Sequence, residues 1–136
     1  IEGPRGGNAA EDAYLYGYRL WDARLYPEAQ AQLQRVIAQY PSHRRASYAG
    51  NLLGRAYLDN NQPTLAVRAF YDNFHTRPSG ERAAESMYYM GMALIRLNRN
   101  PDACRTFSEF DRSYGATASA ALKAQVATAR GQASCA

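Results

Sequence analysis

The chain has 136 residues, of which 46% are hydrophobic and 21% are charged, a size and balance that favour one compact domain with a buried core. No apolar run approaches the roughly 18 residues that a membrane-spanning helix needs, so we expect a protein that is not inserted in a membrane. The formal net charge is +4, but the basic residues are spread along the chain and never form a run longer than Arg44 and Arg45. A nucleic-acid-binding protein should show a basic stripe, so we expect no nucleic-acid partner.

Residues 1–9 contain the Pro- and Gly-bearing stretch IEGPRGG. We expect them to be a linker or an engineered remnant rather than part of the fold. Because the chain begins at Ile1 rather than Met, we also expect a processed product or a fragment from which any signal peptide has been removed.

Residues 10–115 contain three copies of one unit. Gly17, Gly54 and Gly91 are separated by steps of 37 residues. The same step relates three further columns, which are Ala29/Ala66/Ala103, Leu33/Phe70/Phe107 and Pro41/Pro78, with Gly115 in the place of the third proline. A fixed period of this length is typical of stacked structural repeats, and it predicts repeats at about 10–43, 47–80 and 84–115.

Each repeat has the apolar spacing of two helices. In the first repeat we expect one helix over about residues 10–24 and a second that begins near Pro27, where a missing N–H costs nothing, and ends at Pro41. Glycine inside a helix costs about 1 kcal/mol relative to alanine, so its recurrence needs a steric reason. We expect the paired helices to cross at the glycines with their backbones almost touching and the alanine column opposite.

The last segment, about residues 117–131, favours a helix that caps the third repeat. Leu122, Val126 and Ala129 form a narrow apolar stripe along it. Gly131 lies where the helix should end.

Position by position, the repeats resemble the tetratricopeptide repeat, which has small residues at its eighth and twentieth positions, an aromatic residue or Leu at the twenty-fourth and Pro at the thirty-second. The usual unit is about 34 residues long, and we place the additional residues in the turns SHRRAS and SGERAA. The resemblance implies an all-α fold, a right-handed tetratricopeptide-repeat solenoid of three helix hairpins and a C-terminal capping helix over residues 10–136.

The length of the repeat, 37 residues, restricts the resemblance to a smaller set of tetratricopeptide-repeat proteins. The segments YPEAQAQLQRVIAQYP, LLGRAYLDNNQPTLAVRAF and MGMALIRLNRNPDACRTF are similar to the C-terminal repeat domain of the YbgF/CpoB family of Tol-Pal-associated periplasmic proteins, over residues 11–136. Two departures stand out: Arg77-Pro78 replaces Tyr-Pro, and the coiled coil through which full-length members trimerise is missing, which leaves the oligomeric state open. The BamD-type lipoproteins of outer-membrane assembly share repeats that end in Tyr-Pro and remain an alternative.

The family resemblance implies a periplasmic, non-catalytic role in cell division. Members coordinate outer-membrane constriction with peptidoglycan synthesis by contacting TolA and a bifunctional penicillin-binding synthase. A third possibility is an accessory domain that binds glycan or peptidoglycan. Members from some lineages also carry cysteines at the matching places, so the resemblance implies a Cys104–Cys135 disulfide, with two idle thiols as the alternative.

The first helices of such an array line its concave face, where we predict a groove for an extended peptide or a helix of a partner protein. The side chains expected there are rich in types enriched at interface hot spots, and they are Tyr14, Tyr18, Trp21, Asp22, Tyr48, Asn51, Glu85, Arg55, Asp59, Tyr88, Met92 and Arg96, with Leu52 and Tyr89 at the margin. Tyr16, Tyr57 and Tyr71 have the spacing of core residues instead.

All the basic residues except Lys123 are Arg, which indicates either a carboxylate-binding or phosphate-binding surface or a bias in codon use.

Motifs of catalysis are missing from the sequence. It has no HExxH, GxxxxGK[ST] or GxGxxG, and His43 and His75 fall near the ends of repeats, where we expect polar turn or helix-end residues. We therefore expect no catalytic residues, no metal and no cofactor.

Overall fold

The structure is a computed structural model, and it describes residues 8–136. That part of the chain is made of seven helices joined by turns, and they are α1 (Ala9–Asp22), α2 (Tyr26–Gln39), α3 (Arg45–Asp59), α4 (Pro63–Thr76), α5 (Ala83–Arg96), α6 (Asn100–Tyr114) and α7 (Ala120–Gln132). The prediction of an all-α chain with three helix pairs and a closing helix is confirmed. None of the described helices combines the length and the apolarity needed to cross a membrane.

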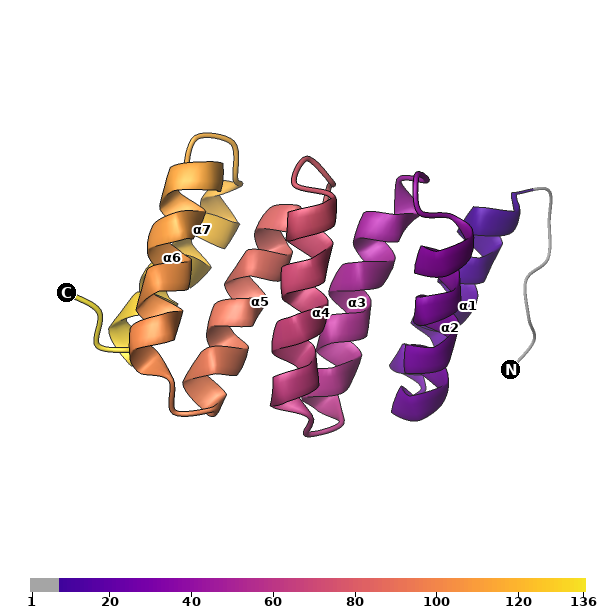
Figure 1. The fold of residues 1–136 in the computed structure, drawn as a ribbon, viewed down its shortest axis with the longest axis horizontal. Coiled ribbons are helices and arrows are strands. Elements are labelled where there is room, and N and C mark those ends of the chain that lie inside the picture. Colours follow the sequence, from indigo (N-terminus) through magenta and orange to yellow (C-terminus); the bar gives the residue numbers. More distant parts are fainter. Residues whose placement is uncertain (1–7) are drawn as a thin grey trace.

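The helices form three antiparallel hairpins that stand side by side, α1–α2, α3–α4 and α5–α6, and α7 packs on α5 and α6 (Figure 1). The first helices of the hairpins make one layer and the second helices make the other. α3 also contacts α1, and α5 also contacts α3. The buried hydrophobic residues of the described part of the chain form three clusters, which partly buried side chains such as Tyr57 and Tyr89 connect. Leu33, Phe70 and Phe107 lie between the layers and are completely buried.

The helix ends follow local sequence rules. Asn8 caps α1 by accepting a hydrogen bond from the backbone N–H of Glu11 at 3.0 Å. Part of the expected linker therefore belongs to the fold, because α1 begins at Ala9, whereas residues 1–7 lie outside the described residues. Proline occupies the first turn of α2, α4 and α6, as expected for Pro27.

The glycines of the first helices meet large side chains, so the expected contact with the alanine column is wrong. A Cβ atom on Gly54 would lie 2.3 Å from Cε1 of Phe70, and one on Gly91 would lie 2.2 Å from Cε1 of Phe107. The ring of the second helix lies directly on the glycine, which leaves no room for a side chain there.

A buried polar network joins α3, α4 and α5. The side-chain amide of Asn73 donates to the carbonyl of Ser47 at 2.9 Å and to Oγ of Ser86 at 3.0 Å, and the Ser86 hydroxyl donates to Oδ1 of Asn51 at 2.9 Å. Gly50 makes room for this amide, because a Cβ atom there would lie 2.1 Å from Oδ1 of Asn73. The network orients the second hairpin against the third through hydrogen bonds that are satisfied inside the core.

A disulfide bond links the C-terminal end of the chain to α6. Cys104 of α6 is bonded to Cys135, with their Cα atoms 5.5 Å apart, as the family resemblance implied. Val126 and Ala129 of α7 are buried as expected. Gly131 lies inside α7 rather than beyond its end, and Ser134 takes the left-handed conformation (φ 57°) that follows the helix.

Candidate partner-binding surface

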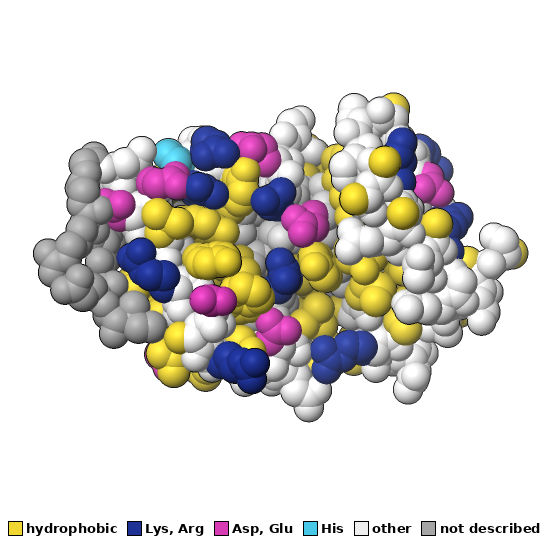
Figure 2. Space-filling view, turned by 180° about the vertical axis from the view of Figure 1, so that it is seen from behind, with side chains coloured by type: hydrophobic (Ala, Val, Ile, Leu, Met, Phe, Trp, Pro, Cys, Tyr) yellow, Lys and Arg dark blue, Asp and Glu magenta, His cyan; other side chains and the backbone are white. Residues whose placement is uncertain are grey.

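The exposed sides of α1, α3 and α5 form one continuous face, on which aromatic rings alternate with arginines. Figure 2 shows this face, with hydrophobic side chains, arginines and carboxylates interleaved across the hairpins. We call it the α1–α3–α5 face and describe its two clusters of side chains in turn.

The first cluster, the Tyr48 cluster, is built on stacked arginines. The guanidinium of Arg45 lies 4.8 Å from the ring centre of Tyr14 and 4.5 Å from that of Tyr48. Its Nε also donates to Oε2 of Glu11 at 2.9 Å. The guanidinium of Arg82, at the start of the third hairpin, lies 4.6 Å from the ring centre of Tyr48. Cation–π contacts of this kind and a fork-shaped ion pair hold three hairpins together here.

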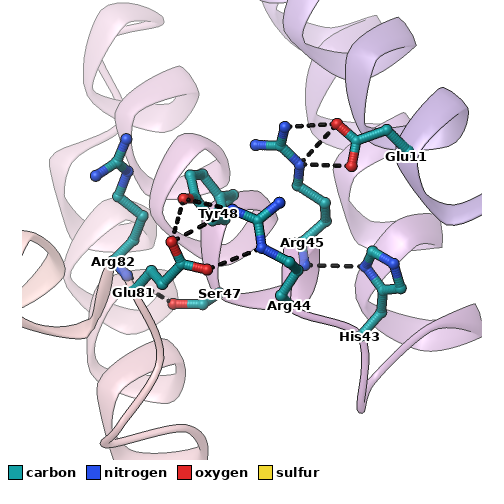
Figure 3. Close-up of polar contacts among 8 residues, drawn as sticks. All are labelled: Glu11, His43, Arg44, Arg45, Ser47, Tyr48, Glu81 and Arg82. Carbon is teal, nitrogen blue, oxygen red and sulfur yellow. Dashed lines mark hydrogen bonds and ion pairs between the residues drawn. The ribbon is translucent and has the colours of Figure 1, made fainter.

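The same cluster contains a second ion pair, which Figure 3 shows. Nε of Arg44 donates to Oε1 of Glu81 at 2.9 Å, and the hydroxyl of Tyr48 donates to Oε2 at 2.7 Å. These hydrogen bonds from Arg44 and Tyr48 lower the pKa of Glu81, and the bond from Arg45 lowers the pKa of Glu11. Each carboxylate is therefore charged at neutral pH and is matched by an arginine.

The second cluster, the Trp21 cluster, joins the same three hairpins. Nε1 of Trp21 donates to Oδ2 of Asp59 at 2.7 Å. The guanidinium of Arg55 lies 5.0 Å from the Trp21 ring and 5.0 Å from the ring centre of Tyr89. Burial raises the pKa of the Tyr89 hydroxyl, which keeps this ring neutral. Tyr18, 42% exposed, extends the surface beside Trp21 with its ring centre 5.8 Å away.

The structure brings together several of the residues predicted for a groove, but three of them are buried. Tyr14 is 8% exposed and packs in the core, with Arg45 over its ring. Asn51 is 4% exposed and accepts a hydrogen bond from Ser86, so it serves the core. Tyr88 is 9% exposed, and together with Met92 it borders a hollow against α7. The capping helix thus takes the place that the prediction gave to a partner in the third repeat.

The other predicted positions lie at the edges of the face. Arg96 donates to the carbonyl of Leu58 at 3.1 Å and to Oδ1 of Asn61 at 2.9 Å, which ties α5 to the end of α3. Asp22 is exposed at the end of α1, and Glu85 is half-buried beside Arg82, with 3.3 Å between Oε2 and Nε.

The division of the tyrosines into core and surface sets is only partly right. Tyr71 is 44% exposed and stacks on His75 with ring centres 5.1 Å apart, so its assignment to the core is wrong. Tyr16 and Tyr57 are half-buried against the first core cluster, and the hydroxyl of Tyr57 accepts a hydrogen bond from Gln34.

Sequence reasoning missed the arginines of the Tyr48 cluster and gave Tyr89 only a marginal place. Arg45 and Arg82 belong to the segments SHRRAS and SGERAA, where the additional residues of the repeat are expected, and they lie one 37-residue step apart. That recurrence was the available signal. The partner ring of each arginine depends on packing between hairpins, which sequence spacing does not show.

Two further hollows are larger than the one beside Met92, and the first of them borders the Tyr48 cluster at Glu81 and Arg82. The first, of about 670 Å³, separates the start of α5 from α7 and includes Glu81, Glu85 and Tyr114 in its wall. The other, of about 540 Å³, lies between α4 and α6 and has an apolar floor that includes Phe74 and Met90. Within residues 8–136 no group of three or more His, Cys, Asp or Glu side chains is placed to hold a metal ion.

Comparisons with known proteins agree with this architecture. A profile of the tetratricopeptide repeat matches residues 85–117, which span most of the third hairpin and the start of the turn that follows it. The chain has the tetratricopeptide-repeat fold. No curated protein sequence matches it significantly.

Several solved structures share this tetratricopeptide-repeat arrangement. The Yersinia enterocolitica type III secretion chaperone SycD, in complex with a peptide of the translocator YopD, superposes with a TM-score of 0.76 at 11% identity, covering 95% of this chain and 92% of that chain. The Sgt2 domain from Aspergillus fumigatus gives 0.73 at 15% identity, covering 96% and 84%. A structure of MamA (MSR-1) gives 0.61 at 20% identity, covering 90% and 66%. Domains of this fold are generally non-catalytic modules that bind proteins or peptides.

Proposed function

We propose that this tetratricopeptide-repeat domain binds an extended segment of a partner protein on its α1–α3–α5 face. The observation that carries the proposal is the Trp21–Arg55–Tyr89 stack, which places aromatic and cationic surface from three hairpins side by side. Trp, Tyr and Arg dominate the energetics of protein interfaces. The surface is held by stacking and ion pairs within the domain, so a partner would meet it already ordered.

The partner class that we propose belongs to the bacterial envelope. The domain would be a periplasmic module of cell division that contacts a TolA-like protein and a peptidoglycan synthase, as the resemblance to the YbgF/CpoB family implies. The Cys104–Cys135 disulfide supports an oxidising compartment such as the periplasm. The alternatives are a scaffold of outer-membrane assembly and an accessory domain that binds peptidoglycan.

Purified components separate these possibilities. The chain would be titrated by calorimetry with the periplasmic domain of TolA, the periplasmic domain of a bifunctional penicillin-binding synthase and an outer-membrane assembly component, and it would be sedimented with purified peptidoglycan. Saturable binding of TolA or the synthase supports the division role, whereas binding of only the assembly component or only peptidoglycan supports the corresponding alternative.

Two variants locate the surface that binds. Trp21→Ala and Arg55→Ala should each weaken binding at least tenfold, since truncating a hot-spot side chain costs about 2 kcal/mol or more. Tyr71→Ala is the matched control, because it removes an exposed ring from α4 in the other layer. Wild-type affinity in both Trp21→Ala and Arg55→Ala would show that the α1–α3–α5 face is not the binding surface.

A further inference from the structure

Arg55 differs from Arg44 and Arg45, the paired arginines of the Tyr48 cluster, in having no carboxylate partner among the described residues. Arg44 pairs with Glu81, and Arg45 pairs with Glu11. Within residues 8–136 no salt bridge or hydrogen bond joins the guanidinium of Arg55 to another side chain, although it is half-buried between two rings. No carboxylate within residues 8–136 therefore neutralises its positive charge by direct contact.

The neighbouring acid of the same cluster is hydrogen-bonded to Trp21 rather than paired with Arg55. Asp59 lies one helical turn after Arg55 on α3, a spacing at which an acid and an arginine commonly pair. Its Oδ2 instead accepts the short 2.7 Å hydrogen bond from the indole of Trp21. Trp21 thus performs two tasks, since it stacks on the guanidinium and it holds the neighbouring acid by hydrogen bonding.

Stacking also prepares the guanidinium for an acceptor. A guanidinium that lies between aromatic faces keeps its N–H groups in its own plane, pointing to the edge where a carboxylate can accept two parallel hydrogen bonds. Little side-chain entropy remains to be lost on binding, because the rings of Trp21 and Tyr89 already fix the orientation.

Building on the proposed function, we infer that Arg55 is the anchor for an aspartate or glutamate side chain within the extended partner segment. The domain would select an acidic residue at that point of the segment. The carboxylate belongs to a side chain rather than to a chain terminus, because the binding face continues from Arg55 toward the Tyr48 cluster in one direction and toward Arg96 in the other. A partner segment that crosses Arg55 can contact both the Tyr48 cluster and the region of Arg96.

Three synthetic nonapeptides test this assignment. The first has a central glutamate flanked by leucines and serines, with both termini blocked. The second has glutamine in place of the glutamate. The third is the glutamine peptide with a free C-terminal carboxylate. Each is titrated into ¹⁵N-labelled protein at low salt and followed by NMR, including the Nε–Hε signal of Arg55, which is identified by its loss in Arg55→Gln.

The glutamate peptide should bind roughly five- to tenfold more tightly than the glutamine peptide, because a charge-assisted hydrogen bond is about twice as strong as a neutral one. It alone should shift the Arg55 Nε–Hε signal. The preference should disappear in Arg55→Gln and persist in Arg68→Gln, which removes an equal charge from a 79% exposed side chain on α4. It should also decrease as salt screens the pair.

Each contrary result has a distinct meaning. Equal affinity for the glutamate and glutamine peptides, or a preference that survives in Arg55→Gln, overturns the anchor while leaving the binding face intact. Tightest binding by the third peptide overturns the side-chain source in favour of a terminal carboxylate. No binding of any peptide also overturns the anchor, and the titrations with envelope proteins then decide separately whether the face binds a partner.

Discussion

Replacing Gly54 with alanine should destabilise the domain, although alanine is the better helix former. Alanine is favoured over glycine inside a helix by about 1 kcal/mol. Against this gain, the new Cβ atom would lie 2.3 Å from Cε1 and 2.4 Å from Cδ1 of Phe70. That ring is completely buried and also stacks on Tyr89 with ring centres 5.8 Å apart, so it has little room to retreat. Overpacking of a core costs about 1–3 kcal/mol, and a ring held this tightly belongs in the upper part of that range, about 2–3 kcal/mol. After the gain in helix propensity, we expect a net loss of about 1–2 kcal/mol in the free energy of unfolding.

Alanine substitutions at other helical glycines allow the change in stability at Gly54 to be compared with positions that have more room. Gly17→Ala should cost less, because the nearest atom is Cδ2 of the flexible Leu33 side chain, 2.7 Å from the new Cβ. Gly131→Ala should instead raise stability by roughly 0.5 kcal/mol, since this helical glycine has nothing within 4 Å of the new atom. The sign of the change is therefore predicted to reverse between two glycines that both lie inside helices.

Urea unfolding followed by far-ultraviolet circular dichroism measures these differences, and Trp21 fluorescence checks that the transition is two-state. In the double variant Gly54→Ala/Phe70→Leu the alanine should cost less than it does alone, which gives a coupling energy between the two sites. The packing argument would be refuted if Gly54→Ala proved as stable as the original protein, or if the two substitutions were simply additive.

Three further changes test the stabilising contacts by the same unfolding assay. Asn73→Ala should cost about 1–3 kcal/mol, because it leaves buried polar groups unpaired, and a loss below about 0.5 kcal/mol would contradict the role given to the network. Reducing the disulfide between Cys104 and Cys135, which are 31 residues apart, should cost up to about 3–4 kcal/mol, whereas the double serine variant should not respond to reductant. The pKa of Glu11 is lowered from its ordinary 4.5 by the hydrogen bond from Arg45, so this carboxylate stabilises the fold above that pH and the contribution is lost as the pH falls through the lower, folded-state value. Glu11→Gln should accordingly cost less than about 1 kcal/mol at neutral pH and progressively less as the pH falls below 4.5, and a cost that did not decrease with acidification would argue against the ion pair.

The two clusters on the α1–α3–α5 face show which parts of the candidate site can be predicted from the sequence and which cannot. Trp21, Arg55 and Asp59 were predicted for the surface, because helical spacing fixes which side of a helix a residue occupies. Their mutual contacts were beyond prediction, since the indole hydrogen bond and the stack join helices from different hairpins. Tyr89 gained its role only through packing of the third hairpin against the second.

The sequence by itself determined the helices, their pairing and the repeat. These properties depend on contacts between residues close in the chain and on one 37-residue period, so local propensity and periodicity are enough to reveal them. Only the tertiary structure decided which side chains fill the space beside each helix. The ring of Phe70, rather than the alanine column, accounts for Gly54, Asn51 belongs to a buried network, and α7 covers part of the expected groove. The physical reason is that burial and stacking depend on the rotation and distance between packed helices, which are set by the shapes of all the side chains at the interface together.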